Sequence, residues 1–330
     1  MSTLYLIEPG ARLEKEYQRL IIVKDGEVLQ RIPTSMVSQV VMIGSTGVTA
    51  PALLHLLQND VGLSLISPTG KLLGRLAPVH APNLALRHQQ YDRTRDPAAC
   101  YDFSRQVVRA KLHNQSALAC RLVRNHREIE PAPLVILRAA LLESKRATSI
   151  DQLRGLEGAG ARAYFEIFRN ALGSQFSFEK RQRRPPTDPI NALLSLGYSL
   201  LTQNAFTALE IVGLDPYDGF FHADRYNRPA LALDLMEEFR PVIVDALIVD
   251  LVNHNRVGLT DFTWRGKACY LSEKALKKFL TAYTTRLRTA VRLPGGDRRT
   301  NYLQCMEHQA RQIRKWIEGE VDRYVPHHTR

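Results

Sequence analysis

The sequence predicts an α+β protein, with a small N-terminal β-sandwich-like domain followed by a larger all-α domain. Three observations support this class. The first 75 residues hold short β-branched runs separated by turn signals, residues 76–83 hold two prolines and no periodicity, and helical spacing of apolar residues follows. We therefore expect a β-rich domain over residues 1–75, a linker over residues 76–83 and a helical domain over residues 84–330.

The β-rich part contains several short candidate strands. They are expected at residues 4–7, 19–23, 27–31, 37–43, 63–66 and 71–74. The dipeptide Asp25-Gly26 favours a tight hairpin turn, because both turn positions require positive φ. Thr49 is a suitable N-cap for one short helix over residues 50–58.

The helical part has recognisable start and stop signals. A long helix is expected over residues 97–125, and Ser149 with Gln152 forms a capping box for a helix reaching about residue 172. Pro189 opens another helix, and Pro241 should interrupt the one that starts near residue 229. The last helix, from about residue 300, has an apolar face made of Leu303, Met306, Ala310, Ile313 and Ile317.

Charge is the most informative part of the composition. The 330 residues carry 45 Lys+Arg against 33 Asp+Glu, a net charge of +12, and residues 264–330 alone hold a net +9. Such a surplus favours a polyanionic partner, although a merely soluble basic protein is the other reading. Candidate contacts to a DNA or RNA backbone are Arg181, Arg183, Arg184, Arg298, Arg299, Arg311, Arg314 and Lys315.

Other classes have little support. No apolar run approaches the roughly 18 residues of a membrane span, and the first ten residues do not read as a secretory signal. Nucleotide-binding glycine loops and paired C-x-x-C motifs are absent from the sequence. The scattered cysteines are typical of a cytosolic protein, so we expect a cytoplasmic location.

Three places have unusual residue choices. Gly155, Gly158 and Gly160 surround Glu157 within a helical pattern, which suggests close approach of another backbone. His222 follows two aromatic residues in an expected loop. The third place is an acidic group on one helical face, Asp234, Glu237 and Glu238.

Each place also has a structural interpretation. The glycines could mark a packed helix crossing with a solvated Glu157, His222 could be a packing residue, and the acidic group could be a surface cluster neutralised by Arg240. A Glu, a His and a second carboxylate would suit a divalent metal ion, but spacing alone does not bring these residues together.

Four blocks in this order resemble one family. They are EGxxAxxYF (residues 157–165), PxNALLSLGYxLL (189–201), GLDPYxGFxH (213–222) and LALDLMEEFRPVIVD (231–245). Together they are similar to the CRISPR-associated integrase of the adaptation module, the Cas one (Cas1) family. The resemblance covers nearly the whole chain.

The resemblance implies a β domain that forms much of a homodimer contact, and a helical catalytic domain. It implies a metal-dependent endonuclease and integrase that inserts new spacers into a CRISPR array with a small partner of the Cas two (Cas2) family. Its substrates would be double-stranded DNA, both protospacer and CRISPR repeat, and its cofactor Mg²⁺ or Mn²⁺. The implied catalytic and metal-binding residues are Glu157, His222 and Glu237, with Asp234 as a supporting acid.

Several assignments stay open at this level. Glu238 competes with Glu237 as the ligand, although the i,i+3 relation to Asp234 favours Glu237. Arg162 and Tyr164 are candidates for positioning a phosphate or supporting the ligands. A general metal-dependent nuclease that acts on branched or single-stranded DNA or RNA without integration would need the same metal site. A noncatalytic DNA-binding scaffold would use the basic C-terminal helices alone.

Overall fold

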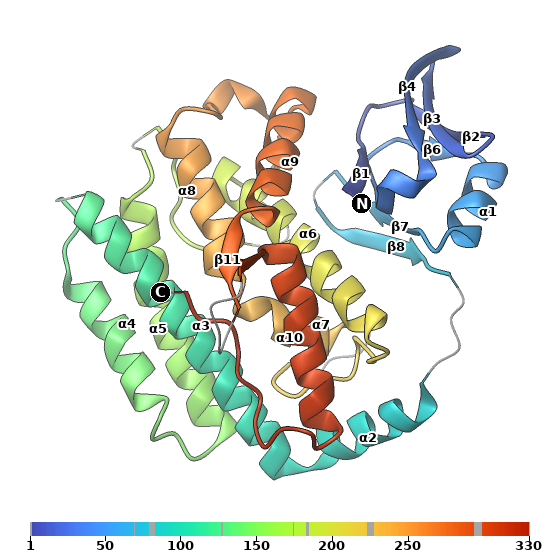
Figure 1. The fold of residues 1–330 in the computed structure, drawn as a ribbon. Coiled ribbons are helices and arrows are strands. Elements are labelled where there is room, and N and C mark those ends of the chain that lie inside the picture. Colours follow the sequence, from blue (N-terminus) through green and yellow to red (C-terminus); the bar gives the residue numbers. More distant parts are fainter. Residues whose placement is uncertain are drawn as a thin grey trace. The chain divides into compact units, whose positions relative to one another are not determined.

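A computed structural model describes residues 2–68, 70–78, 83–126, 128–173, 175–182, 185–222, 228–293 and 299–329. The chain divides into two compact units. The first contains residues 1–81, 182–199 and 257–281, and the second contains residues 82–181, 200–256 and 282–330. The predicted α+β class is confirmed, since strands gather in the N-terminal part and helices follow (Figure 1). The predicted linker over residues 76–83 stays a prediction, because residues 79–82 lie outside the described residues.

Two four-stranded sheets form in the N-terminal part. Their orders are β1-β5-β7-β8 and β4-β3-β2-β6. The strands are β1 (Ser2–Leu6), β2 (Arg12–Glu16), β3 (Arg19–Lys24), β4 (Glu27–Pro33), β5 (Val37–Ile43), β6 (Gly47–Val48), β7 (Gly62–Ile66) and β8 (Leu72–Leu76). Both sheets contribute to one buried core, with Leu6 and Val40 from the first and Leu13 and Leu20 from the second. This shared core is what makes the region sandwich-like.

Local signals in this part are confirmed. Asp25 and Gly26 both have positive φ, at 51° and 84°, at the turn that joins β3 to β4. The side chain of Thr49 accepts a hydrogen bond from Ala52 N at 3.4 Å and caps α1 (Ala50–Gln58). The sequence does not predict strand β2, because its residues RLEKE are too polar to read as a strand.

The rest of the chain is mostly helical. The helices are α2 (Leu84–Arg95), α3 (Pro97–Asn125), α4 (Ala132–Glu143), α5 (Ile150–Asn170), α6 (Pro189–Ile211), α7 (Ala230–Glu237), α8 (Ala246–Asn253), α9 (Glu273–Leu287) and α10 (Tyr302–Ile317). Helix α3 packs against α4, α5 and α7. The all-α description is wrong in detail, since two short ribbons also form. These are β9 (Phe262–Arg265) with β10 (Ala268–Leu271), and β11 (Ala290–Arg292) with β12 (Arg299–Asn301).

The predicted helix boundaries have their expected causes. Ser149 Oγ accepts from Gln152 N at 3.2 Å, while Gln152 Oε1 accepts from Thr148 N at 2.8 Å, one residue earlier than in a standard capping box. After α7 the backbone forms a π-helical turn over Arg240–Asp245 and continues as α8. Pro241 lacks a backbone N–H, so the helix is interrupted here as predicted.

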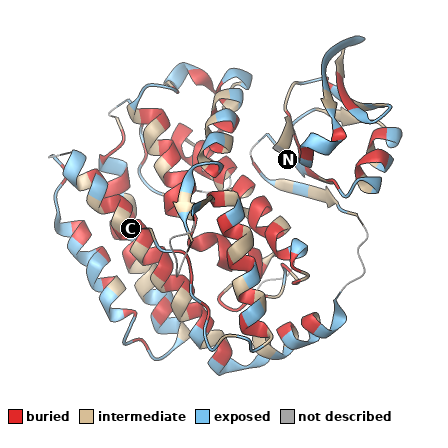
Figure 2. Ribbon diagram, in the orientation of Figure 1, coloured by how far each residue is buried: buried red, intermediate tan, exposed pale blue. Residues whose placement is uncertain are grey.

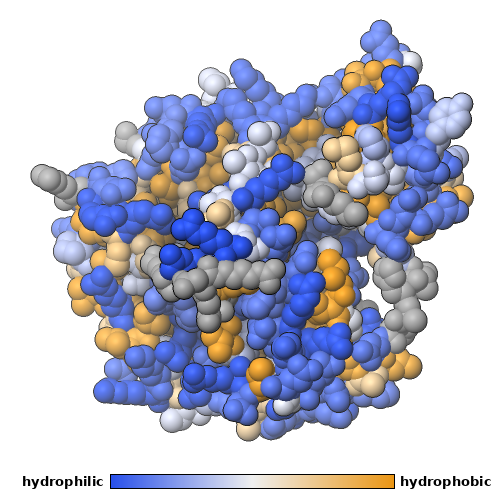
Figure 3. Space-filling view, in the orientation of Figure 1, coloured by the Kyte–Doolittle hydropathy of each residue, from blue (hydrophilic) through white to orange (hydrophobic). Residues whose placement is uncertain are grey.

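Burial follows the amphipathic pattern of the helices. Buried residues gather where helices face one another, whereas hydrophilic side chains predominate on the face drawn in Figure 3, with smaller apolar areas between them (Figures 2 and 3). On α10, Met306, Ala310, Ile313 and Ile317 are buried, and Leu303 is half-buried. Among the described residues, no helix is both long and apolar enough to cross a membrane.

The three glycines of α5 have different surroundings. A Cβ at Gly160 would collide with Leu112 Cδ2 and lie 3.3 Å from Leu137 Cδ1, so this glycine permits close packing with α3 and α4. A Cβ at Gly155 would meet nothing within 4 Å, and at Gly158 only the end of the Arg162 side chain. The predicted close packing is therefore found at Gly160, although against side chains and not against another backbone, and it is absent at Gly155 and Gly158.

This difference predicts opposite effects of alanine within one helix. We expect Gly155→Ala to raise the free energy of unfolding by about 0.5–1 kcal/mol through helix propensity. Gly160→Ala should lower it by about 1–3 kcal/mol, because Leu112 and Leu137 must move. Urea unfolding of both variants measures the contrast, and equal effects at the two positions would contradict the packing role of Gly160.

Candidate metal centre

The three residues predicted to form the catalytic set lie together in the second unit. Glu157 comes from α5, His222 from the loop before α7, and Glu237 from the last residue of α7. The ammonium of Lys111, on α3, pairs with Glu157 Oε1 and lies 2.8 Å from Glu237 Oε2. His222 Nε2 lies 3.7 Å from Glu237 Oε1. One small cluster therefore joins four segments that are far apart in sequence.

Asp234 organises the loop that carries His222. Its carboxylate accepts the backbone N–H groups of Phe220, Phe221 and His222 at 2.8, 3.0 and 3.1 Å. A Cβ at Gly219 would lie 2.6 Å from backbone atoms at the start of α7, so glycine lets the loop come this close. The acidic residue thus holds the loop against α7.

The same carboxylate fixes the tautomer of His222. His222 Nδ1 lies 2.6 Å from Asp234 Oδ1. An ionised carboxylate only accepts hydrogen bonds, so Nδ1 carries the proton and donates. Nε2 then presents its lone pair on the side of Glu237. This arrangement is the usual support for a histidine that binds a metal ion.

Glu237 is buried yet charged. Its side chain is 2% exposed, and Arg240 Nη1 lies 3.1 Å from its Oε1 atom. Burial by itself raises the pKa of this carboxyl, but the positive charges around it, Arg240 first and Lys111 second, outweigh burial and lower the pKa to about 2. Neutralisation by Arg240 is confirmed, but the surface location is wrong, because all three acids of the group are buried.

Glu238 faces away from this cluster, towards the C-terminal segment. Its Oε1 accepts from Tyr324 O–H at 2.6 Å, and its Oε2 accepts the backbone N–H of His327. Gln309 Nε2 adds a longer contact at 3.4 Å. Burial raises the pKa of Glu238 to about 8 despite these donors. The geometry therefore supports Glu237, and not Glu238, as the candidate ligand.

The C-terminal segment is also tied to α3. Asn114 Nδ2 donates to His327 O at 2.9 Å and to Glu238 O at 2.7 Å, and Asn114 Oδ1 accepts from Thr329 N at 2.8 Å. The buried ring of His327 stacks on Phe239, with centroids 5.5 Å apart. Residues 324–329 thus cover Glu238, the residue that follows α7. We call this segment the C-terminal clasp.

The donor set fits a divalent cation. Two carboxylates and an imidazole nitrogen suit Mg²⁺ or Mn²⁺, and Glu237 Oε2 is a buried oxygen that has an ion pair but no aligned hydrogen bond. In the described part of the chain, no three Asp, Glu, His or Cys side chains are arranged to hold a metal ion as they stand. The Lys111 ammonium takes the position between the two glutamates instead.

The candidate phosphate contacts have mixed outcomes. Arg162 is exposed on α5 and Arg181 is half-buried. Tyr164 is fully buried and donates to Asp245 Oδ2 at 2.7 Å, so its side chain does not face a DNA backbone, and that suggestion is wrong for this residue. Arg183, Arg184 and Arg298 lie outside the described residues.

The basic C-terminal residues are less free than their charge suggests. Arg311 lies 3.6 Å from Glu307, Arg314 makes paired contacts to Glu318 at 3.0–3.1 Å, and Lys315 lies 3.6 Å from Glu320. Arg299 is exposed on β12 and pairs in register with Arg292 of β11. Residues 264–330 belong to both units, and the boundary between the units falls within α9.

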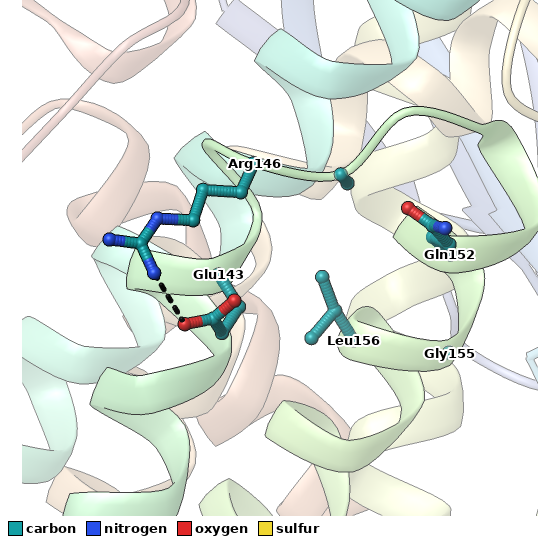
Figure 4. A pocket seen from close by; sticks show the side chains of 6 residues that line it. Glu143, Arg146, Gln152, Gly155 and Leu156 are labelled. Atoms are coloured by element: carbon teal, nitrogen blue, oxygen red, sulfur yellow. Dashed lines mark ion pairs between the residues drawn. The ribbon is translucent and has the colours of Figure 1, made fainter.

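A surface pocket lies between the end of α4 and the start of α5. Gln152, Gly155 and Leu156 line it from α5, and the ion pair between Glu143 and Arg146 lies across from them (Figure 4). None of the predicted site residues is among those lining it. The pocket is therefore separate from the cluster around Glu157.

Sequence reasoning missed Lys111 and the C-terminal clasp. Lys111 lies on the buried stripe of α3 with Val107, Val108 and Gln115. A lysine at an otherwise buried helix position could have indicated a buried ion pair, because lysine is rarely buried without a partner. The clasp had no such signal, because its hydrogen bonds to Glu238 join residues more than 80 positions apart.

The clasp predicts a specific pH dependence. Burial lowers the pKa of His327 to about 4, and His328 acts in the same direction. The unfolded chain therefore binds a proton near pH 6.5 that the folded chain does not, so the stability due to neutral His327 is lost as pH falls from about 6.5 to about 4. His327→Phe keeps the stacking but does not titrate.

We expect the free energy of unfolding of His327→Phe, relative to the native chain, to rise by about 2 kcal/mol between pH 7.5 and pH 5. Other titrating groups, Glu238 included, are present in both proteins and cancel in the difference. Urea unfolding at the two pH values measures it. A difference that does not change with pH would show that His327 is not held neutral by burial.

Comparison with known proteins places the chain in a family. A profile described as CRISPR associated protein Cas1 matches residues 4–285. A CRISPR-associated endonuclease Cas1 of Thermus thermophilus is 38% identical over 328 residues, covering 99% of this chain and 97% of that protein. A Cas4 exonuclease/Cas1 endonuclease fusion of Geobacter sulfurreducens is 34% identical over 99% of this chain, which spans only 60% of the fusion.

Solved structures of Cas1 proteins share the fold of this chain. A Cas6-RT-Cas1–Cas2 complex contains a chain that is 26% identical with a TM-score of 0.86, covering 98% of this chain and 36% of that one. A Cas1 protein from Thermotoga maritima shares the fold, with a TM-score of 0.83, 22% identity and 97% of each chain covered. The chain therefore belongs to the Cas1 family of CRISPR-associated endonucleases.

Proposed function

We propose that this endonuclease is a metal-dependent integrase that inserts new spacers into a CRISPR array. It would cleave a phosphodiester of the array and join the 3′-hydroxyl of the spacer DNA to the phosphate of the cleaved bond. The observation that carries the proposal is the convergence of Glu157, His222 and Glu237, with Nε2 of His222 free to bind a metal ion beside Glu237. A noncatalytic scaffold would not need two buried acids, Asp234 and Glu237, beside a histidine held in one tautomer.

The proposed cofactor is Mg²⁺ or Mn²⁺, held by Glu157, His222 and Glu237. When bound, such an ion polarises a phosphate oxygen and stabilises negative charge on the reacting phosphate. The chain's own residues prepare the site for it. Asp234 holds His222 in the binding tautomer, and the positive charges around Glu237 keep its carboxylate ionised with a pKa of about 2.

The ribbon of β11 and β12 is the best-supported DNA contact. Arg292 and Arg299 are both exposed and lie opposite each other in its register. Two exposed guanidinium groups on one face of the ribbon offer two contacts to a phosphate backbone.

The proposed partners are double-stranded DNA, namely protospacer and CRISPR repeat, a second copy of the chain, and a Cas2 protein. The Cas2 assignment is supported by the Cas6-RT-Cas1–Cas2 complex, in which one chain shares the fold of this protein at 26% identity. The homodimer is supported by strand β4, which lies at the edge of its sheet and exposes Val28 and Leu29. Because its substrate is cellular DNA, we place its action in the cytoplasm.

The metal centre makes a direct prediction. Glu157→Gln, His222→Gln and Glu237→Gln should each lower metal-dependent cleavage and strand joining at least about 100-fold, because each removes a ligand. The assay is half-site integration of a short duplex into a supercoiled plasmid carrying a CRISPR array, with Cas2 present.

Glu166→Gln is the matched control, since Glu166 is exposed on the same helix as Glu157. Its activity should equal that of the native chain. Full activity in all three ligand variants would refute the metal centre. Cleavage that depends on these residues but gives no joined product would favour a general nuclease instead.

The β11–β12 ribbon predicts a change in salt dependence. Replacing Arg292 and Arg299 by alanine should weaken duplex binding and reduce the slope of log affinity against log salt by about 2, one for each phosphate that is no longer neutralised. Fluorescence anisotropy between about 50 and 200 mM salt measures the slope. Arg314→Ala should change it less, because Glu318 already holds that guanidinium. An unchanged slope in the double variant would exclude the ribbon as a DNA-binding element.

A further inference from the structure

Lys111 is an unusual residue to find inside this protein. Its side chain is 8% exposed on the buried stripe of α3. A buried ammonium is costly unless it is paired, and lysine is rarely buried otherwise. Both partners of Lys111 are proposed metal ligands, Glu157 and Glu237. The burial of this lysine is therefore explained by the metal centre and by nothing else that the described contacts show.

The position of the ammonium is that of a bridging cation. Nζ contacts one oxygen of a carboxylate from α5 and, at 2.8 Å, one oxygen of a carboxylate from α7. Without a positive charge there, the two carboxylates would repel each other in a region of low dielectric constant. Lys111 thus holds the ligands close together before any metal ion arrives.

The sum of the charges in the cluster shows how a divalent ion would change its interaction with a phosphate. Glu157, Asp234 and Glu237 contribute three negative charges, while Lys111 and Arg240 contribute two positive charges, so the net charge is −1 with His222 neutral. A cluster of net −1 repels a DNA phosphate. A divalent ion in place of Lys111 makes the net charge 0, which removes this repulsion.

We infer that Lys111 is a positioning residue that acts as a resident counter-cation. It occupies the place between Glu157 and Glu237 in the metal-free protein, keeps both ligands in place, and leaves when a divalent ion binds. The inference rests on the proposed metal centre. Its consequence is that the ammonium and the divalent ion compete for the same two oxygens, so Lys111 weakens metal binding while it stabilises the metal-free fold.

The test is Mn²⁺ binding by isothermal titration calorimetry on the full chain. Lys111→Met keeps an unbranched side chain that is one atom shorter and removes the charge, and it should bind Mn²⁺ at least 10-fold more tightly than the native chain. Lys111→Arg keeps the charge and should not bind more tightly. Lys145→Met, at an exposed position outside the cluster, should leave the affinity unchanged.

Thermal unfolding gives a second readout. The metal-free Lys111→Met protein should melt below the native chain, and saturating Mn²⁺ should raise its melting temperature by more than it raises that of the native chain. A loss of packing alone would lower both melting temperatures without tightening Mn²⁺ binding. Unchanged or weaker Mn²⁺ affinity in folded Lys111→Met overturns the inference.

Amine labelling of the native chain avoids any substitution. In the metal-free protein Lys111 should react slowly compared with exposed Lys145, and Mn²⁺ should increase its labelling several-fold. Labelling that Mn²⁺ does not change overturns the inference. Mn²⁺ binding that is lost in Glu157→Gln and His222→Gln, but unaffected by Lys111→Met, would leave the proposed function standing and reject only the role of Lys111. Absence of Mn²⁺ binding in every variant would reject both.

Discussion

Helix α7 is only eight residues long, yet it and the residue after it bury three carboxylates, and the surrounding unit is arranged to accommodate them. Asp234, Glu237 and Glu238 are each 0–2% exposed. A buried carboxylate needs hydrogen-bond donors or a positive charge. The three acids satisfy this requirement differently. Asp234 receives backbone N–H groups and a histidine, Glu237 receives cations, and Glu238 receives the donors of the C-terminal clasp.

The partners of these three carboxylates come from parts of the chain that are far apart in sequence. Glu237 and Glu238 are neighbours, so their side chains leave the helix in different directions, and each draws in a different set of partners. Lys111 and Asn114 lie one helical turn apart on α3, where the first contacts Glu237 and the second holds the clasp beside Glu238. One face of α3 therefore stabilises both the metal centre and the chain end.

How much could be predicted from the sequence depends on the distance over which each interaction acts. The pairing of Arg240 with Glu237 was predictable, because i,i+3 neighbours meet on a helix. The convergence of the three candidate ligands followed only from the family resemblance, because no local rule brings separate segments together. The glycines of α5 look alike in sequence, but only Gly160 faces two other helices, and a short pattern does not contain those neighbours. Strands β9 to β12 are three or four residues long, too short for a visible alternation.

The distribution of charge separates two tasks. The basic surplus of residues 264–330 is divided between both units, and much of it on α10 is already paired with carboxylates. In the proposed function it would attract DNA without choosing where the reaction takes place. That choice would fall to the cluster around Glu237, whose net charge of −1 is unfavourable for a phosphate until a divalent ion cancels it. On the proposed function, DNA held by the basic surface would not react while Lys111 fills the position between Glu157 and Glu237.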